Sequence, residues 1–278
     1  MWRQHQRCIS PGMVVADPIH QSRATLNPYL SVGGLLLSRL RWDFDYRSWI
    51  SRSRMKSLAG QYRGQKAVIV CNGPSVLNTD WSLLKGVYTF GLNKVNLLFD
   101  QAAFRPSCIV AVNPYVLEQN REFYNSTDIP LFLDSHALQL GVRFRKNSVL
   151  LHRTGIDKFA RDCSVSLNWG GTVTYVAMQL AFHFGFSDVA LIGCDHNFSA
   201  TGPANGVVRR KGEDRDHFHP DYFADGQLWQ LPDLNLSEAS YRRAADVYQA
   251  FGHRLVNATE GGKLEILPRL SLQEFVGR

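Results

Sequence analysis

The chain has 278 residues, enough to bury a sizeable core in one large domain or two small ones. Its 45% hydrophobic and 20% charged residues are ordinary for a globular protein, and no apolar run approaches the ~20 residues of a membrane-spanning helix. The net charge is +7, but residues 1–60 carry nine Arg and Lys against three Asp, whereas residues 61–278 carry 22 basic against 21 acidic residues. The amino-terminal segment is therefore the basic part of the chain.

The basic segment allows two interpretations. It is an extension that packs on the domain or on a partner subunit of a homo-oligomer, or it makes peripheral contact with an anionic membrane surface or a polyanionic substrate. No nucleic-acid-binding motif accompanies the charge, which argues against a nucleic-acid partner. The chain start lacks the apolar core of a secretory signal, and the five cysteines show no Cys-x-x-Cys pair. We expect free, buried thiols in a cytoplasmic protein, at the inner face of the membrane if the segment binds lipid.

Along the chain, residues 1–30 lack clear periodicity and are expected to run over the surface. Residues 33–59 predict a helix, and Gly60 and Gly64 break the pattern, so we expect a basic extension over 1–60 and an α/β domain over 61–278. The apolar stripe of the expected helix consists of Leu36, Leu37, Leu40, Phe44 and Ile50.

After the break, short apolar runs alternate with helical stretches. This alternation predicts an α/β fold, Rossmann-like, with a mainly parallel sheet, helices on both faces and right-handed crossovers. The expected strands cover residues 67–71, 87–91, 108–112, 130–133, 148–151, 188–193 and 253–256.

The second half of the domain holds the clearest unit and the longest connection. Residues 172–184 predict a helix that ends at Gly185, directly before the strand at 188–193. Residues 199–236 mix glycine, proline and charge, and a connection of this length is typical of a lid or binding loop. A further helix is expected from Ser237, as its cap, to Phe251.

Polar residues follow several of the expected strands. Because parallel strands end at one edge of a sheet, these residues are expected to meet in a ligand crevice there. Asparagine amides both donate and accept hydrogen bonds, so they can bind a nucleobase, a ribose or a sugar, although turn formation is an alternative role. The candidate binding residues are Asn72, Gly73, Pro74, Ser75, Asn93 and Asn113, together with Gly171, Thr172 and Thr174 at a helix amino terminus that favours an anion.

Asp195 follows the strand at 188–193 and is a candidate for ribose, metal or acid/base chemistry, with turn capping as the alternative. In the lid, His217 or His219 is a candidate general base oriented by a carboxylate. The His-x-His pair could instead bind a metal or simply be solvated. Residues 209–211, Arg-Arg-Lys, are candidates for phosphate contacts or a solvated charge run.

Two nucleotide-binding fingerprints are absent from the sequence. There is no Gly-x-Gly-x-x-Gly after a strand and no Gly-x-x-x-x-Gly-Lys-Ser/Thr. The sequence therefore disfavours hydride transfer and P-loop phosphoryl transfer.

The motifs resemble a known family. Asn72-Gly73-Pro74-Ser75, Gly91-Leu92-Asn93, Asn113-Pro114, Gly171-Thr172-Val173-Thr174 and Ile192-Gly193-Cys194-Asp195 are similar to motifs of the MptE-like family, over about residues 60–265. That family includes archaeal 6-hydroxymethylpterin diphosphokinase and bacterial motility accessory factors linked to flagellin glycosylation.

The layout is also similar to that of the Campylobacter-type bacterial sialyltransferases, which use CMP-sialic acid. This resemblance implies that Asn72, Asn93 and Asn113 hold a cytidine nucleotide and that a lid histidine is the base. Those enzymes have an arginine where this chain has Asn168-Trp169-Gly170-Gly171, and tyrosines where it has His196-Asn197-Phe198. These differences argue against sialic acid itself as the sugar.

The resemblance leads to three hypotheses. The first is a glycosyltransferase with a CMP-linked sugar donor and a glycan or protein acceptor, with no required cofactor, in which Asp195 contacts the ribose or the sugar. The second is an ATP-dependent diphosphokinase acting on a pterin-like alcohol, with Mg²⁺ held by Asp195. The third is a nucleotide-binding protein without catalytic activity.

Overall fold

The computed structural model describes residues 28–199 and 202–277. Its centre is a seven-stranded parallel sheet in the order β5-β4-β3-β2-β1-β6-β9. The chain builds the sheet outward from β1 to β5 and then returns to add β6 and β9 on the other side of β1. The strands are β1 (Lys66–Val70), β2 (Tyr88–Leu92), β3 (Cys108–Ala111), β4 (Leu131–Asp134), β5 (Ser148–Leu151), β6 (Asp188–Ile192) and β9 (Arg254–Asn257).

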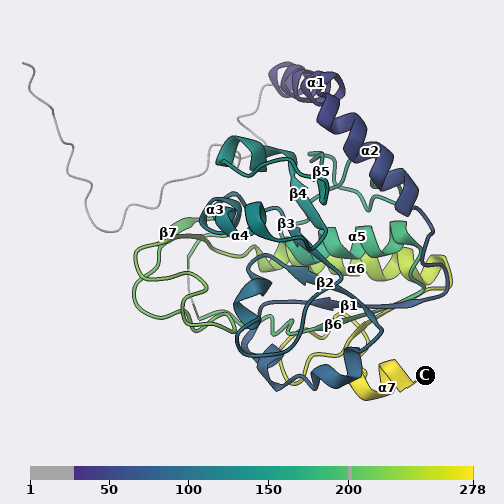
Figure 1. Cartoon of the computed structure of the whole chain (residues 1–278), viewed down its shortest axis with the longest axis vertical. Coiled ribbons are helices and arrows are strands. Elements are labelled where there is room, and N and C mark those ends of the chain that lie inside the picture. The colour runs from purple at the N-terminus through teal and green to yellow at the C-terminus, as the bar shows by residue number, and fades with distance from the viewer. Residues whose placement is uncertain (1–27, 200–201, 278) are drawn as a thin grey trace, which may run out of the picture.

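Helices cover both faces of this sheet, as the α/β pattern predicts (Figure 1). The long helices α2 (Tyr46–Leu58), α5 (Val173–Phe184) and α6 (Leu234–Ala250) contribute to one apolar layer. The other layer uses shorter helices, which are α3 (Pro114–Gln119), α4 (Arg121–Ser126), α7 (Leu272–Gly277) and the 3₁₀ turns η3 (Pro74–Asn78), η4 (Trp81–Leu84), η5 (Val95–Leu98) and η6 (Ser135–Leu140).

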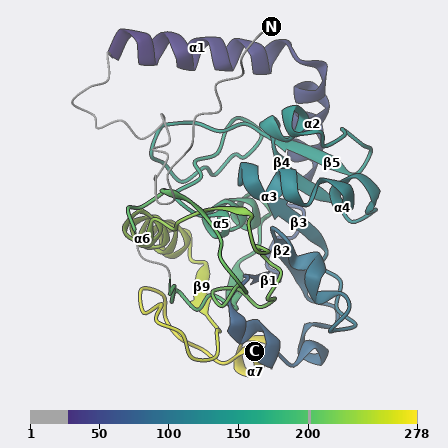
Figure 2. The same ribbon diagram turned by 90° about the vertical axis from the view of Figure 1, so that its left-hand side faces the viewer.

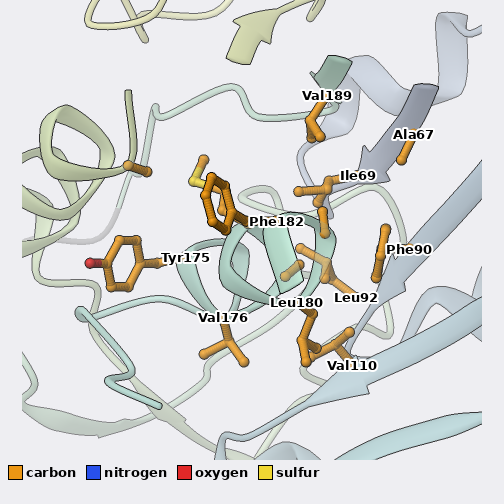
Figure 3. Packing of buried hydrophobic residues seen from close by; sticks show 14 of the residues in the cluster. Ala67, Ile69, Phe90, Leu92, Val110, Tyr175, Val176, Leu180, Phe182 and Val189 are labelled. Atoms are coloured by element: carbon orange, nitrogen blue, oxygen red, sulfur yellow. The ribbon is translucent and has the colours of Figure 1, made fainter. Parts of the chain in front are cut away.

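Alternation along each strand supplies both layers, because successive side chains point to opposite faces. In β1, Ala67 and Ile69 pack with α5, whereas Val68 and Val70 pack on the other face. Figure 3 shows the α5 layer from close by, with Val176 and Leu180 of the helix near the strand residues. Both faces are buried, so the strands are continuous apolar runs, which is typical of a parallel sheet.

The basic segment forms two helices where the periodicity predicts one. Helix α1 (Pro28–Phe44) is separated from α2 by Asp45, which caps α2 by accepting a hydrogen bond from the Arg47 backbone N–H at 2.9 Å. Helix α1 lies across one end of the molecule (Figure 2). Of the expected apolar stripe, Leu36, Leu37, Leu40 and Phe44 lie on α1 and Ile50 lies on α2, and all five are exposed. Residues 1–30 were expected to run over the surface without regular structure. Residues 1–27 lie outside the described residues, and the last three residues of this range belong to α1, which begins at Pro28.

The described part of the lid contains regular secondary structure. It contains an antiparallel hairpin of β7 (Val207–Arg209) and β8 (Leu228–Gln230), which the sequence pattern did not predict. The lid ends earlier than expected, because Asp233 and not Ser237 caps α6 and accepts from the Leu236 backbone N–H at 3.0 Å. In the part of the chain that is described, no helix is both long and apolar enough to cross a bilayer.

Four cysteines, Cys71, Cys108, Cys163 and Cys194, are buried free thiols, as expected. The fifth, Cys8, lies outside the described residues. The division of the chain at residue 60 stays a prediction.

Candidate active site

A cavity of about 150 Å³ lies where β1 and β6 end side by side. This is the point at which the strand order reverses, and open α/β sheets bind ligands at such points. Among the described residues, no lysine or arginine lines the cavity. Its lining consists of Cys71, Asn72, Gly73, Asn93, residues 171–174, residues 193–198, Asp216, His217, Pro232, Leu234, Ser237 and Tyr241.

The turn after β1 forms the floor of this cavity and is held by the end of β6. The Gly73 N–H donates to the Gly193 carbonyl at 2.8 Å, and the Ser75 N–H donates to Asp195 Oδ2 at 3.1 Å. A Cβ on Gly73 would lie 1.8 Å from Asp195 Oδ2, so only glycine fits here. Asp195 therefore fixes the turn with one carboxylate oxygen and lines the cavity at the same time.

Two strand-end asparagines bring unpaired amide oxygens to this region. Asn72 Oδ1 is buried and has no hydrogen-bond partner among the described residues. Asn93, with φ of 50°, lies beside Tyr222, and neither its buried Oδ1 nor the Tyr222 hydroxyl has a well-oriented protein partner in the described chain. Because an unpaired buried acceptor costs ~1–3 kcal/mol, these atoms are positions at which a ligand or water would bind.

Three of the expected binding residues lie outside the cavity lining. Asn113 caps α3 by accepting from the Tyr115 and Val116 N–H groups at 3.0 and 3.3 Å, and its Nδ2 donates to Gln230 of the lid at 3.3 Å. Pro74 and Ser75 open the 3₁₀ turn η3 behind the floor. Their expected contacts with a nucleotide stay predictions.

The amino terminus of α5 forms a second wall, as expected for Gly171, Thr172 and Thr174. Thr172 is the cap residue, and its hydroxyl accepts from the Thr174 N–H at 3.3 Å. Gly170 and Gly171 adopt positive φ of 55° and 76°, which turns the chain into the helix. The first turn of a 12-residue helix carries partial positive charge, and among the described residues it lines a cavity that has no lysine or arginine.

The lid closes the cavity, and hydrogen bonds besides that of Asn113 to Gln230 fasten it to the sheet edge. The Phe218 N–H donates to the Asn72 carbonyl at 3.0 Å. Lys94, which follows β2 and is 5% exposed, donates from Nζ to the Tyr222 carbonyl at 2.5 Å and to Gln119 Oε1 at 2.8 Å. Burial lowers the pKa of Lys94 to about 8.

Of the two lid histidines, His217 lines the cavity and His219 does not. The His217 ring stacks on Tyr222 with centroids 4.1 Å apart, and its Nδ1 lies 2.8 Å from Asp214 Oδ2. A carboxylate only accepts, so Nδ1 donates, and in the neutral imidazole Nε2 carries the lone pair that a general base requires. Burial alone would raise the pKa of Asp214, but the hydrogen bond from His217 and nearby charges hold it below its ordinary value. His219 Nδ1 accepts from the Asp221 N–H at 3.1 Å.

The three basic residues at 209–211 lie away from this cavity. Arg210 is enclosed within the lid, where it donates to Asp216 Oδ2 at 2.9 Å and Asp214 Oδ1 at 3.1 Å. Arg209 and Lys211 line a separate, open hollow of about 610 Å³. Arg210 fixes the two carboxylates beside His217, and the expected phosphate contacts of residues 209–211 stay predictions.

Sequence reasoning missed a second histidine–carboxylate pair at the cavity. His196 adopts φ of 50°, and its Nε2 lies 3.2 Å from Glu238 Oε1 on α6. The Tyr241 ring of α6 lines the same wall, 6.3 Å from the His196 ring. His196 directly follows Asp195 at the strand end, which was an available signal. No sequence pattern near His196 indicated that it pairs with Glu238, which lies 42 residues later in the chain.

The donor set for a metal ion is small. In the described segments, no three or more His, Cys, Asp and Glu side chains group as a metal site. Both Asp216 oxygens are occupied, by the Ser199 N–H at 2.6 Å and by Arg210. Asp195 Oδ1 is therefore the one cavity carboxylate oxygen without a partner among the described residues, and it is a poor fit for Mg²⁺ unless a ligand supplies further oxygens.

The family model described as 6-hydroxymethylpterin diphosphokinase MptE-like matches residues 45–201, more than half of the chain. The chain belongs to the MptE-like family. The MptE-like match includes Asn72, Asn93 and Asp195, and it stops before His217 and Glu238. The floor of the cavity is thus family sequence, whereas most of the lid lies beyond it.

Other comparisons add little to the MptE-like assignment. A search of curated proteins found no match. A solved structure with a similar layout is a MAf glycosyltransferase from Magnetospirillum magneticum AMB-1, with a TM-score of 0.49 and 17% sequence identity. The similarity covers 82% of this chain and 38% of that protein, so the chain spans well under half of its length.

Proposed function

We propose that this protein is a glycosyltransferase that uses a CMP-linked sugar donor, with His217 as the base. The observation that carries the proposal is the placement of the His217–Asp214 pair in the same cavity as the unpaired amide of Asn72. The floor offers neutral groups that can bind a nucleoside, and the lid offers a base. This is the arrangement that activation of a hydroxyl beside a bound nucleotide needs.

The charge of the cavity supports a nucleotide with one phosphate. Asn72 and Asn93 can bind a base or a ribose without adding charge. The amino terminus of α5 favours a single anionic group, and no lysine or arginine from the described parts of the chain lines the cavity to bind a diphosphate or triphosphate. A CMP-linked sugar carries one phosphodiester and matches this charge.

The chemistry needs no cofactor. His217 Nε2 removes the proton of the acceptor hydroxyl, the acceptor oxygen bonds to the anomeric carbon, and the bond from that carbon to the phosphate oxygen of CMP breaks. CMP leaves with the electron pair, and Asp214 stabilises the imidazolium. The cavity of about 150 Å³ is smaller than the ~300–1,000 Å³ of typical ligand pockets, so the lid opens to admit the donor and closes to exclude water.

A diphosphokinase is the second candidate, since the family model carries that name. That reaction needs Mg²⁺ and a bound triphosphate. The described cavity lining offers one unpartnered carboxylate oxygen and no lysine or arginine, which disfavours a diphosphokinase. A non-catalytic nucleotide-binding protein is the third candidate. It would need the asparagine amides of the floor but would not need the His217–Asp214 pair.

Nucleotide binding and donor turnover test the proposal together. We expect CMP to raise the melting temperature more than UMP or CTP does, and ATP with Mg²⁺ to have little effect. We also expect slow hydrolysis of at least one donor in a panel of CMP-linked acidic sugars, followed by release of CMP. Stabilisation by ATP–Mg²⁺ alone would overturn the proposal in favour of the diphosphokinase. Binding of CMP without turnover of several CMP-linked sugars would favour the non-catalytic protein.

A further inference from the structure

The carboxyl-terminal part of helix α1 has one face against the domain, and the opposite face of the helix is exposed and apolar. Val32 and Leu35, which are 54% and 51% exposed, add further apolar surface outside that face. Trp42, 7% exposed, stacks on His152 with centroids 5.2 Å apart, and Arg39 Nη1 donates to the Val165 carbonyl at 3.1 Å. The outward face has helical spacing, so its side chains form one continuous stripe. Its residues and exposures are Tyr29 86%, Leu36 60%, Leu37 58%, Leu40 50% and Phe44 80%.

Aromatic residues extend this stripe at the corner between the two helices. Tyr46 is 62% exposed and Trp49 58%, and Trp49 Nε1 donates to the Asp43 carbonyl at 2.6 Å. With Tyr29 near the other end of α1, aromatic rings flank the aliphatic centre at both ends. Aromatic side chains with a polar atom favour the boundary between water and lipid.

The charges around the stripe are positive. Asp43 and Asp45 are the acidic residues of α1 and of the linker to α2, and arginines pair with both of them. Arg41, on α1, is exposed and has no hydrogen bond or ion pair within the described chain. Residues 1–60 hold almost the whole excess of positive charge of the protein.

We propose that α1 lies flat on an anionic lipid bilayer, with Leu36, Leu37 and Leu40 buried among the acyl chains. An apolar helix face with flanking arginines and terminal aromatic residues is the pattern of helices that bind at this depth. With 17 residues, α1 is ~25 Å long, shorter than a spanning helix requires. A second copy of the chain is the competing occupant, but pairing two α1 helices would bring two positively charged segments together, whereas anionic lipid neutralises them.

Docking in this way also orients the rest of the molecule. The segment beneath α1, residues 152–167, leaves the carboxyl end of β5 and leads into the α5 wall of the cavity. This segment therefore connects the surface beneath α1 to the wall of the cavity. This inference stands independently of the proposed reaction, because it uses none of the cavity residues.

Co-sedimentation of the full chain with vesicles tests the proposal. We expect binding to phosphatidylcholine vesicles that contain 30% phosphatidylglycerol, weak binding to pure phosphatidylcholine, and release of part of the protein at high salt. The double variant Leu36→Glu/Leu40→Glu should reduce the partition coefficient by about tenfold or more, since it places charge in the acyl region. Arg41→Glu should reduce it by a few-fold, in anionic vesicles only.

Matched controls separate this effect from misfolding and from self-association. Leu77→Glu changes a leucine that is 48% exposed on η3, and Lys85→Glu changes an exposed lysine, and both should bind vesicles like the wild type. Circular dichroism should show equal melting for all variants, because the altered side chains are exposed. The proposal would be overturned if Leu36→Glu/Leu40→Glu bound vesicles as well as the wild type. It would also be overturned if the wild type did not bind vesicles and formed a dimer in lipid-free solution, and the double variant were a monomer.

Discussion

The two sides of the cavity are built in different ways. The strand-end side depends on backbone geometry within short segments, with Gly73 and Gly193 allowing two turns to approach each other. The lid side depends on side chains, with Arg210, Asp214 and His217 held in one buried hydrogen-bonded cluster. The first side is a rigid floor, whereas the second can move as a unit if its few contacts with the floor break.

This difference between floor and lid predicts which substitutions affect ligand binding and which affect catalysis alone. Substitutions in the floor should affect folding and nucleotide binding together, because the same backbone serves both. Substitutions in the lid cluster should affect turnover while leaving the floor able to bind. The following predictions test this division.

The largest effect should come from His217→Gln. It removes the base and keeps a side chain of similar size on the Tyr222 ring, so we expect turnover of the CMP-linked donor to fall by ~10²–10⁴-fold with CMP affinity nearly unchanged. Steady-state kinetics and calorimetry measure the two quantities. His219→Gln is the matched control on the same lid and should retain activity. Equal losses in both variants would contradict the role of His217.

Gly73→Ala should damage the floor. The added Cβ would overlap Asp195 Oδ2, and forcing the two segments apart should cost ~1–3 kcal/mol of stability or more and abolish CMP binding. Urea unfolding and calorimetry provide the measurements. Gly33→Ala is the control, since a Cβ there meets no atom within 4 Å. Normal CMP binding by Gly73→Ala would show that the turn is not part of the site.

Lys94→Met tests the fastening of the lid through pH. Burial lowers the pKa of Lys94 to about 8 in the folded protein, against ~10.4 when unfolded. Between these values the unfolded chain holds the proton that the native state has lost, so the contribution of Lys94 to the free energy of unfolding rises with pH from about 8 to ~10.4. Urea unfolding of both proteins across this range should show that rise in the wild type and not in the variant. Parallel pH profiles would show that Lys94 titrates normally.

The smallest effect should come from Asn113→Ala. Loss of the α3 cap should cost ~1 kcal/mol of stability, while CMP affinity stays close to that of the wild type, because Asn113 lies outside the cavity lining. Asn113→Ser keeps a capping oxygen and should recover most of the stability. A large loss of CMP affinity in both variants would instead support the sequence-based role of Asn113 in the nucleotide site.

The sequence predicted those features of the fold and of the site that depend on residues close together in the chain. Continuous apolar runs identified all seven strands of the main sheet to within one or two residues, and strand-end polarity located Asn72, Gly73 and Asp195 at one edge. The β7–β8 hairpin was missed because its strands have three residues each and carry no periodic signal. The pairing of His196 with Glu238 was also missed, because it joins a strand end to a helix across the fold.

Two boundaries were misjudged for local reasons. Ser237 resembles a helix cap in sequence, but Asp233 lies one turn earlier and its carboxylate takes that place. The single helix expected over 33–59 breaks at Asp45, where an Asp–Arg pair two residues apart caps the second helix. In both cases the structure uses an aspartate as the helix cap at a position where the sequence pattern had not predicted a helix start.

The hydrogen bond from Phe218 to the Asn72 carbonyl links the two sides of the cavity through a single residue. Asn72 offers its side chain to the cavity and its backbone to the lid, so a ligand that orders Asn72 also favours the closed lid. By thermodynamic reciprocity, whatever holds the lid shut must raise affinity for that ligand by the same factor. Asn72 would then act as a latch, so that occupancy of the floor and closure of the cavity become one cooperative event.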